Sequence, residues 1–301
     1  MLKGIAASVL ASVLFGGIYY LSPLLLPLDG EQIFGWRVIL TWPFTTAMLL
    51  WRGQGGRVAD LLVHARASWK YGAMLLVCAA LLGVQLWLFM WAPLHGRALP
   101  VSLGYFLLPL VMVLTGCLVF RERLSTGQKL ATALAAAGVA HEALRVGGLS
   151  WETLVVALGY PLYFMLRRRL GTGHLGGHWL DMTLLVPAGL WFMLRAPSSL
   201  LQLDSHPVLL ALLPLLGVLS ATALALYMAA SRWLPMGLFG LLTYVEPVLL
   251  VMVAMLLGER VLPEQWWTYG LVFAAVGVLV IEGLRKMLNE SRARPEPQSV
   301  E

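Results

Sequence analysis

The sequence predicts an all-α integral membrane protein, and its composition and the length of its apolar segments carry that prediction. Hydrophobic residues make up 59% of the 301-residue chain, charged residues make up 12%, and the mean hydropathy is +0.80. Soluble domains contain about 25% charged residues, so this balance argues against one. A bilayer core about 30 Å thick needs roughly 20 apolar residues per helical crossing, and a chain of this length can therefore supply about ten transmembrane helices.

Ten apolar segments follow one another along the chain, separated by short polar connections. The first begins directly after Lys3 and is longer than the apolar core of a signal peptide, about 7 to 15 residues, so we expect a retained helix. The sixth and seventh are short, and Arg167 to Arg169 and Arg195 are expected to extend from their ends toward the membrane interfaces. The expected helices cover residues 4–28, 33–51, 71–94, 101–120, 127–146, 151–166, 180–194, 208–230, 236–257 and 266–284.

Lysine and arginine residues are distributed unevenly between alternate connections. Sixteen of the 21 fall on one side of the expected topology and four on the other, while Arg37 lies inside a helix and counts for neither. Cytoplasmic connections of membrane proteins carry the excess of basic residues, so both termini are expected in the cytoplasm. An even number of crossings agrees with this placement.

The two halves of the sequence resemble one another weakly. GYFLLPLVMVLTGCLVFRER, which begins at Gly104, is similar to LLTYVEPVLLVMVAMLLGER, which begins at Leu241. Because five crossings reverse the direction of the chain, two such halves form an inverted repeat, as in many transporters. We expect a first five-helix repeat at 1–147, a second at 148–287, and a disordered cytoplasmic tail at 288–301.

Several functional classes find no support in the sequence. The net charge of +6 comes from basic residues scattered singly between apolar runs, which fits membrane topology better than nucleic-acid binding. Cys78 and Cys117 lie in apolar runs and behave as small hydrophobic residues. His174 and His178 stand four residues apart, but two histidines without a third ligand are weak evidence for a metal. We expect no cofactor and no metal site.

Two charged residues inside expected helices are the leading candidates for a substrate site. Glu246 lies near the middle of segment 236–257, where a charged side chain costs at least about 2.5 to 3.5 kcal/mol. We expect it to bind a cationic substrate group or a coupling proton; the alternative is a protonated or paired Glu that holds the backbone opened by Pro247. Arg37, about one turn into the second helix, offers a fork of donors for a substrate carboxylate, and the alternative is a side chain that reaches the nearby headgroups.

Aromatic and polar side chains within the apolar runs complete the candidate site. Trp87 and Trp91 are four residues apart and share one helix face, and aromatic walls bind organic cations or ring-shaped substrates. Ordinary packing and the aromatic belt at the membrane interface are the alternative explanation. The candidates are Gln85, Trp87, Trp91 and Tyr105, together with Tyr227 and Tyr244, whose helices flank Glu246.

Two Glu-Arg pairs end the fourth and ninth helices on opposite membrane faces. They are Glu122 with Arg123 and Glu259 with Arg260. Exposed ion pairs contribute about 0 to 1 kcal/mol, so we expect them to anchor the helix ends, with a role as gates as the alternative.

One part of the sequence carries a family resemblance. The stretch from Trp87 to Val139 contains SLGYF, then PLV and then ERL, and it is accompanied by GWRVILTW at residues 35–42 and GLLTYVEPVLLVMVAMLLGER at residues 240–260. In these motifs the chain resembles, over essentially its full length, the RarD-like permeases of the EamA branch of the drug/metabolite transporter superfamily. Arg37 matches an arginine of this pattern, whereas Glu246 replaces the small or apolar residue usual there.

The resemblance implies an inner-membrane carrier in which two inverted five-helix repeats surround a central cavity. It also implies substrates that are commonly moved outward: amino acids and related zwitterions, aromatic compounds, opine-type metallophores and drugs. Trp36 replaces the histidine that precedes the matching arginine in the family pattern.

The function expected from these observations is secondary transport by alternating access, driven by an ion or concentration gradient, in a bacterial inner membrane. An enzyme is not expected, because the chain has neither a GxxxxGK[ST] nor an HExxH motif. The alternatives are a non-transporting membrane receptor or assembly partner, and an intramembrane lipid-modifying enzyme. The expected partners are a small-molecule substrate, the lipid bilayer and, as a further candidate, a coupling proton; the oligomeric state stays open.

Overall fold

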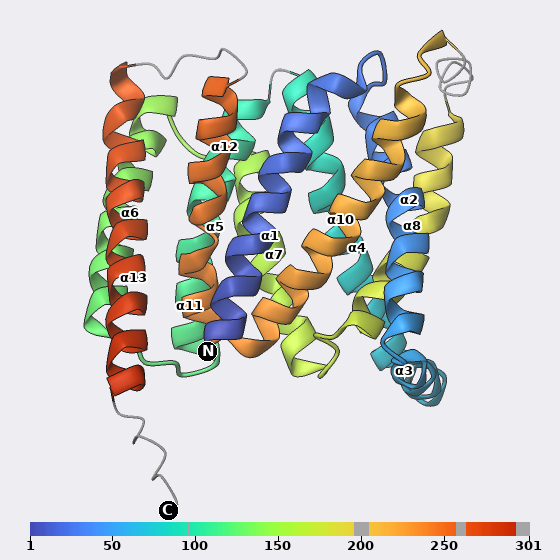
Figure 1. Cartoon of the computed structure of the whole chain (residues 1–301), viewed down its shortest axis with the longest axis horizontal. Helices are drawn as coiled ribbons and strands as arrows, with labels where there is room; N and C mark the ends of the chain where they lie inside the picture. Colours follow the sequence, from blue (N-terminus) through green and yellow to red (C-terminus); the bar gives the residue numbers. More distant parts are fainter. Residues whose placement is uncertain (96, 196–204, 257–262, 293–301) are drawn as a thin grey trace, which may run out of the picture.

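The computed structural model describes residues 1–95, 97–195, 205–256 and 263–292, and every regular element in these ranges is a helix. Most helices stand side by side along one direction (Figure 1). The elements are α1 (Leu2–Leu21), η1 (Ser22–Leu25), α2 (Gly30–Trp51), α3 (Gly55–Ala67), α4 (Trp69–Leu94), α5 (Ala98–Val119), α6 (Thr126–Val146), α7 (Trp151–Arg169), α8 (Leu175–Leu194), α10 (Leu209–Trp233), α11 (Met236–Leu242), α12 (Val245–Leu256), η2 (Pro263–Gln265) and α13 (Trp266–Arg292).

Six stretches of these helices are long and apolar enough to cross a bilayer, which makes the chain a multi-pass membrane protein. They are Leu2–Leu25, Gly30–Trp51, Trp69–Ala92, Pro100–Phe120, Leu209–Trp233 and Pro263–Glu282. The other expected segments are also helical, as α6, α7, α8 and the pair α11 and α12. These helices are not both long and apolar enough to count among the six, because they are interrupted or carry charged residues such as Glu152 and Asp181.

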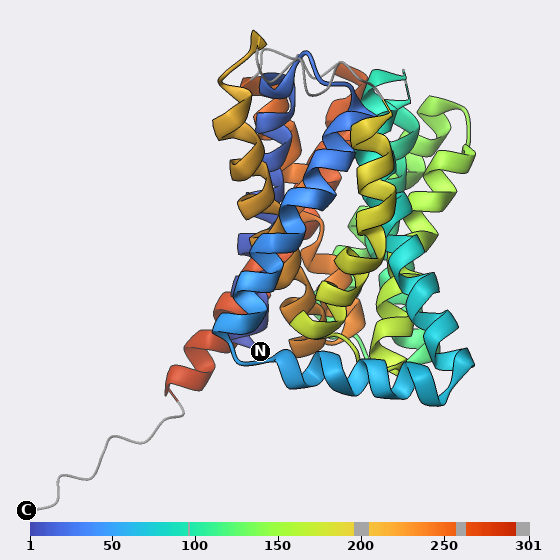
Figure 2. The same ribbon diagram turned by 90° about the vertical axis from the view of Figure 1, so that its right-hand side faces the viewer.

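Helix α3 was not expected from the sequence. It lies across the end of the bundle that carries the N-terminus (Figure 2). Val58 and Leu61 are buried, and Val58 packs with Leu175 while Leu61 packs with Leu75 and Leu180. The segment escaped notice because it is only 13 residues long and shows a polar outer face. α3 and the ends of α2, α7 and α10 carry most of the arginines at this end of the molecule, which we therefore call the basic face.

The boundaries of α7 and α8 correct a second expectation. α7 continues to Arg169 and α8 begins at Leu175, so neither helix is short. Arg167 therefore stays inside α7, where its side chain is 1% exposed, and it does not reach toward the membrane interface. Arg195 at the other end of the bundle is exposed and forms an ion pair with Glu31 at 3.3 Å, in accordance with an interfacial position.

The expected ninth helix is broken into two. α11 ends at Leu242, α12 begins at Val245, and Thr243 caps the end of α11 through its backbone N–H. Every residue of α11 is buried. α13 runs to Arg292, so residues 288–292 of the expected disordered tail are helical, and residues 293–301 lie outside the described ranges.

The two halves of the chain are intertwined, because helices of the first half pack mainly on helices of the second. α1 packs on α10 and α12, α2 on α8 and α10, α5 on α7 and α11, and α6 on α13. Glycines permit the close approach: a Cβ added to Gly35 would lie 2.7 Å from the carbonyl oxygen of Gly189, and one added to Gly104 would lie 2.8 Å from that of Thr153. Small residues at helix interfaces are the usual device for packing helices in membranes.

Candidate functional site

A pocket lies at the centre of the bundle, where seven helices and the break between α11 and α12 meet. The open space within it is about 20 Å³, which is room for about one water. The side chains that line it come from both halves of the sequence: Phe15, Arg37, Leu86, Phe89, Tyr105, Leu108, Tyr160, Tyr227, Thr243 and Glu246.

Arg37 places a positive charge in this central pocket. It lies two turns into α2 and is 2% exposed, so its guanidinium does not reach the headgroup region. Its Nε donates a hydrogen bond to Ser220 Oγ at 3.0 Å, and its guanidinium carbon lies 5.8 Å from the centroid of the Phe89 ring. One donor is thus used to orient the guanidinium, and the side chain lines the pocket.

Glu246 lies in the first turn of α12, directly after the helix break. Its backbone N–H donates to Thr243 O, as the turn between the two helices requires. The Glu246 carboxylate and the Arg37 guanidinium interact electrostatically across the pocket, but among the described residues they form no ion pair within 4.0 Å. The two charges therefore face the same space without neutralising each other by direct contact.

Aromatic rings form the walls between these charges. The Phe89 and Tyr105 rings meet edge to face with centroids 5.9 Å apart, and Tyr105 lies 6.4 Å from Tyr160. On the other side Phe15 meets Tyr227 edge to face at 5.6 Å. Such rings present apolar faces and, in the tyrosines, polar tips, and so suit a ligand that is both apolar and polar.

Four of the eight residues proposed from the sequence line the central pocket, namely Arg37, Tyr105, Tyr227 and Glu246. The other four do not line it. Gln85 donates from Nε2 to Val155 O at 2.8 Å and so ties α4 to α7. Tyr244 donates its hydroxyl hydrogen to Phe106 O at 2.9 Å within a separate apolar cluster.

Trp87 and Trp91 form an aromatic stack beside the pocket. Their ring centroids are 5.2 Å apart, and Trp91 in turn stacks on His95 at 4.3 Å. The spacing of four residues correctly placed them on one face of α4, but that face packs toward Trp151 at the start of α7. Sequence spacing shows which residues share a face and not which neighbour the face meets.

Tyr160 was the main pocket residue not singled out from the sequence. It stands three residues before Tyr163 in the run GYPLYF, and Tyr163 turns toward α8 while Tyr160 turns toward the pocket. Phe15, Phe89 and Thr243 were missed as well, because a Phe or Thr in an apolar run carries no signal of a site.

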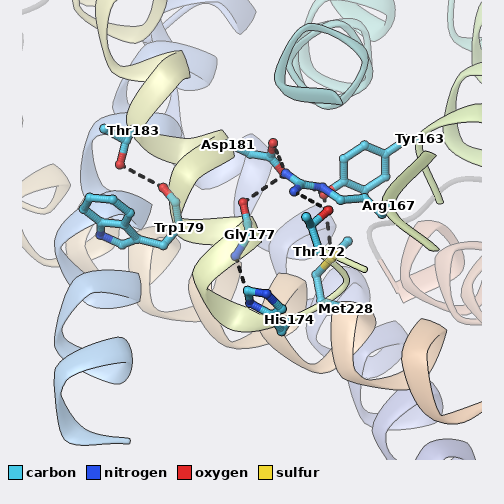
Figure 3. Close-up of polar contacts among 9 residues, drawn as sticks. All are labelled: Tyr163, Arg167, Thr172, His174, Gly177, Trp179, Asp181, Thr183 and Met228. Atoms are coloured by element: carbon cyan, nitrogen blue, oxygen red, sulfur yellow. Dashed lines mark hydrogen bonds and ion pairs between the residues drawn. The ribbon is translucent and has the colours of Figure 1, made fainter. Parts of the chain in front are cut away.

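A second buried polar network joins α7 to α8 (Figure 3). Arg167 forms an ion pair with Asp181, and it donates to Thr172 Oγ1 at 3.0 Å and to Gly177 O at 2.9 Å. The Tyr163 hydroxyl donates to Asp181 Oδ2 at 2.8 Å. Arg167 and Asp181 are each at most 1% exposed, so the pair neutralises two charges that neither lipid nor the protein interior could hold singly.

Glu122 connects three elements at the basic face. It accepts hydrogen bonds from the backbone N–H groups of Met236 and Gly237 at 2.8 Å, which begin α11, and it pairs with Arg168 of α7 at 2.7 Å. Its partner is therefore Arg168, not the neighbouring Arg123, and its role goes beyond the end of its own helix. Glu259 and Arg260, the second expected pair, lie outside the described residues.

Several histidines have structural partners, whereas His178 is buried and neither of its ring nitrogens is hydrogen-bonded to another described residue. His174 caps α8 by accepting from Gly177 N–H at 3.2 Å, and His141 lies 3.0 Å from Thr268 Oγ1. Within the described ranges no three His, Cys, Asp or Glu side chains are grouped so as to hold a metal ion.

Comparisons with known proteins place the chain among bacterial transporters. No protein-family model matches the sequence. It is 40% identical to an uncharacterized transporter of Haemophilus influenzae, over 95% of the chain and 96% of that protein, and 42% identical to the chloramphenicol-sensitive protein RarD of Pseudomonas aeruginosa, over 96% and 97%. A protein RarD of Streptomyces exfoliatus is 30% identical over 91% of the chain and 86% of its own length.

The fold, with its apolar helices, and these relatives define the chain as a membrane transporter. It belongs to the RarD family of permeases, which confirms the resemblance seen in its motifs. A solved structure described only as a crystal structure of a protein has the same overall fold, with a TM-score of 0.61 over 94% of this chain and 97% of that one. At 17% identity that likeness concerns the fold alone.

Proposed function

We propose that the protein is a secondary transporter of amino-acid-like zwitterions with an aromatic or other apolar side chain. The observation that carries this proposal is the central pocket, in which Arg37 and Glu246 face one space between aromatic rings. A carboxylate on the substrate pairs with the guanidinium of Arg37. An ammonium group pairs with Glu246, and the side chain packs among Tyr105, Tyr160 and Phe89. A zwitterion satisfies both charges at once, which neither a simple anion nor a simple cation does.

Alternating access is part of the proposal. The central pocket has room for about one water, so substrate entry requires the helices to move apart. Between the pocket and the basic face lie the rings of Phe164, Tyr227 and Phe239, with centroids 4.8 to 5.4 Å apart. Tyr227 lines the pocket, whereas Phe164 lines a second cavity beyond the rings. Separation of these rings opens a path toward the basic face.

The proposed inverted repeat is supported by the pattern of helix contacts. Pairing α1 with α7, α2 with α8, α4 with α10, α5 with α11 and α12, and α6 with α13 maps each main contact among these helices onto another one or, for α2 with α8, α5 with α11 and α6 with α13, onto itself. For example, the contact of α1 with α10 corresponds to that of α7 with α4, and the contact of α5 with α7 corresponds to that of α12 with α1. A pseudo-twofold arrangement of five plus five membrane crossings accounts for this correspondence, and such symmetry allows one assembly to open to either side.

Location and direction complete the proposal. The basic face, with α3 and the N-terminus, is placed in the cytoplasm of a bacterial plasma membrane, because basic residues concentrate there. The bacterial relatives named as transporters support this location. Export is the direction proposed, driven by the gradient of the substrate or of a coupling ion, with protonation of Glu246 as the candidate coupling step.

The test is counterflow of labelled phenylalanine into proteoliposomes, combined with binding measured on the purified protein. We expect phenylalanine to bind better than its methyl ester, which lacks the carboxylate, and better than its N-acetyl derivative, which lacks the ammonium. In Arg37→Gln the preference over the ester disappears, and in Glu246→Gln the preference over the N-acetyl derivative disappears. Each loss is worth about 1.5 to 3 kcal/mol, or roughly ten- to a hundredfold in affinity.

Arg285→Gln and Glu264→Gln are the matched controls, because both residues are exposed and neither lines the pocket. Both are expected to transport as the wild type does. Equal transport by the wild type, Arg37→Gln and Glu246→Gln, with unchanged selectivity, would overturn the proposed site. Accumulation of a chemically altered product in the vesicles would point instead to an enzyme.

A further inference from the structure

A second cavity opens at the basic face, separated from the central pocket by the ring of Phe164. Its volume is about 120 Å³, against about 20 Å³ for the central pocket. Phe164, Arg167 and Arg168 of α7 line one side, and Ser231 and Arg232 at the end of α10 line the other; two glycines of the turn after α7 complete it. We call it the basic-face cavity.

The lining carries three arginines and, among the described residues, no carboxylate. Two of the charges have partners outside the lining, since Arg167 pairs with Asp181 and Arg168 with Glu122. Arg232 has no acidic partner in the described part of the chain. The Asp181 and Glu122 contacts fix the two guanidinium groups of α7, while the charge of Arg232 stays uncompensated.

One hydrogen-bond donor of Arg167 is also unused. Arg167 Nε is buried and has no hydrogen-bond partner, although the other nitrogens of the same guanidinium donate to Thr172, Gly177 and Asp181 (Figure 3). A buried donor without a partner costs about 1 to 3 kcal/mol.

His174, beside the cavity in the turn before α8, reports the positive potential of this region. Its pKa is lowered to about 4, first by burial and then by the nearby charges of Arg57, Arg232 and Arg167, against a smaller opposing effect of Asp60. The guanidinium groups therefore outweigh the local carboxylates.

We infer that the basic-face cavity binds an oxyanion group, either a carboxylate or a phosphate. Arginine forks match the geometry of both groups, and a cavity of this volume admits one such group with its first substituent. A soluble anion and the headgroup of an anionic phospholipid share this chemistry. The site is separate from Arg37, and the inference holds whether or not the protein carries zwitterions.

The experiment compares the wild type with Arg232→Gln, a change at an exposed position that leaves the buried Arg167–Asp181 pair in place. Inorganic phosphate and acetate are titrated into the detergent-purified protein at constant ionic strength, and binding is followed by thermal stabilisation. In parallel, retention of phosphatidylglycerol is compared with that of phosphatidylcholine by native mass spectrometry. Arg285→Gln is the matched control for the loss of an exposed arginine on the same face.

Binding of phosphate or acetate that weakens about tenfold or more in Arg232→Gln, and stays unchanged in Arg285→Gln, supports a site for soluble anions. Selective retention of phosphatidylglycerol that is lost in Arg232→Gln alone supports a lipid headgroup as the occupant. If Arg232→Gln matches the wild type for both soluble anions and lipid, or if Arg285→Gln loses as much, the inference is overturned. None of these measurements involves transport. A negative result would therefore overturn the oxyanion site without bearing on the proposed transport of zwitterions, which is tested separately.

Discussion

Single charged residues inside the bundle are held in two different ways. Arg167 is neutralised by Asp181 and surrounded by hydrogen-bond partners, which makes it part of the framework. Arg37 has a single hydrogen bond, to Ser220, and faces Glu246 across an aromatic pocket without an ion pair in the described structure. A charge that is fully paired contributes to the fold, whereas a charge left facing a pocket is available to a ligand.

The buried pair leads to a prediction about stability. Asp181→Asn leaves the Arg167 charge buried without compensation, and we expect a loss of about 3 to 5 kcal/mol in the free energy of unfolding. Denaturant titration of the purified protein in detergent measures it. The double variant Arg167→Met, Asp181→Leu removes both charges and is expected to recover most of the loss. An Asp181→Asn protein as stable as the wild type would show that the pair is dispensable.

At the scale of helices, close packing and a broken segment shape the site. α11 and α12 meet at Thr243 and Tyr244, and this break puts Glu246 in the first turn of a helix beside the pocket. Interrupted helices at the middle of the membrane are a recurrent way to build transporter sites, because irregular backbone is tolerated where protein or a cavity satisfies it. Pro247, which lacks the N–H that a continuous helix would donate to Thr243 O, is the sign of this break in the sequence, although the expected helix 236–257 ran through it.

Helix packing gives a second prediction. A Cβ added to Gly35 of α2 would meet backbone atoms of α8, 2.7 Å from Gly189 O and 2.8 Å from Met193 N, and backbone cannot retreat as a side chain can. Gly35→Ala is therefore expected to cost about 1 to 3 kcal/mol in unfolding free energy. Gly17→Ala in α1 is the control, because a Cβ there meets nothing within 4 Å and alanine favours a helix by about 0.5 to 1 kcal/mol. Equal unfolding midpoints for the Gly35→Ala and Gly17→Ala variants would count against tight packing of α2 on α8.

At the scale of the whole molecule, the uneven distribution of basic residues predicts how the bundle sits in the membrane. α3 and the ends of α2, α7 and α10 carry most of the arginines at the basic face (Figures 1 and 2). The negative surface of the cytoplasmic leaflet attracts such residues. The connection between α6 and α7 lies at the opposite end and carries no lysine or arginine between Val146 and Trp151.

Single cysteines test this orientation. In a background with Cys78→Ala and Cys117→Ala, we expect Arg66→Cys in α3 and Arg169→Cys at the end of α7 to react with a membrane-impermeant thiol reagent only after the cells are opened. Leu149→Cys, which is 52% exposed between α6 and α7, is expected to react in intact cells. The reverse labelling pattern would show that the protein has the opposite orientation in the membrane. Labelling of Arg66→Cys and Arg169→Cys from opposite sides would exclude the proposed number of membrane crossings between these two positions.

The sequence by itself determined the class of the protein. Apolar segments of bilayer length, few charges and the motifs between Trp87 and Val139 were enough to identify a helical membrane protein of the RarD family. They were enough because the bilayer imposes its thickness on every crossing segment, so length and composition carry the information. Arg37 and Glu246 could also be selected, since a charge within an apolar run stands out.

The tertiary structure alone decided which side chains meet. Tyr105 and Tyr227 line the pocket with Tyr160, while Gln85, Trp91 and Tyr244 contact other helices and Trp87 stacks on Trp91. In a soluble protein, the apolar side of a helix marks the face that is buried. In a membrane the lipid-facing side is as apolar as the packed side, so the sequence has no periodicity from which the inward face can be read, and only the packed bundle shows it.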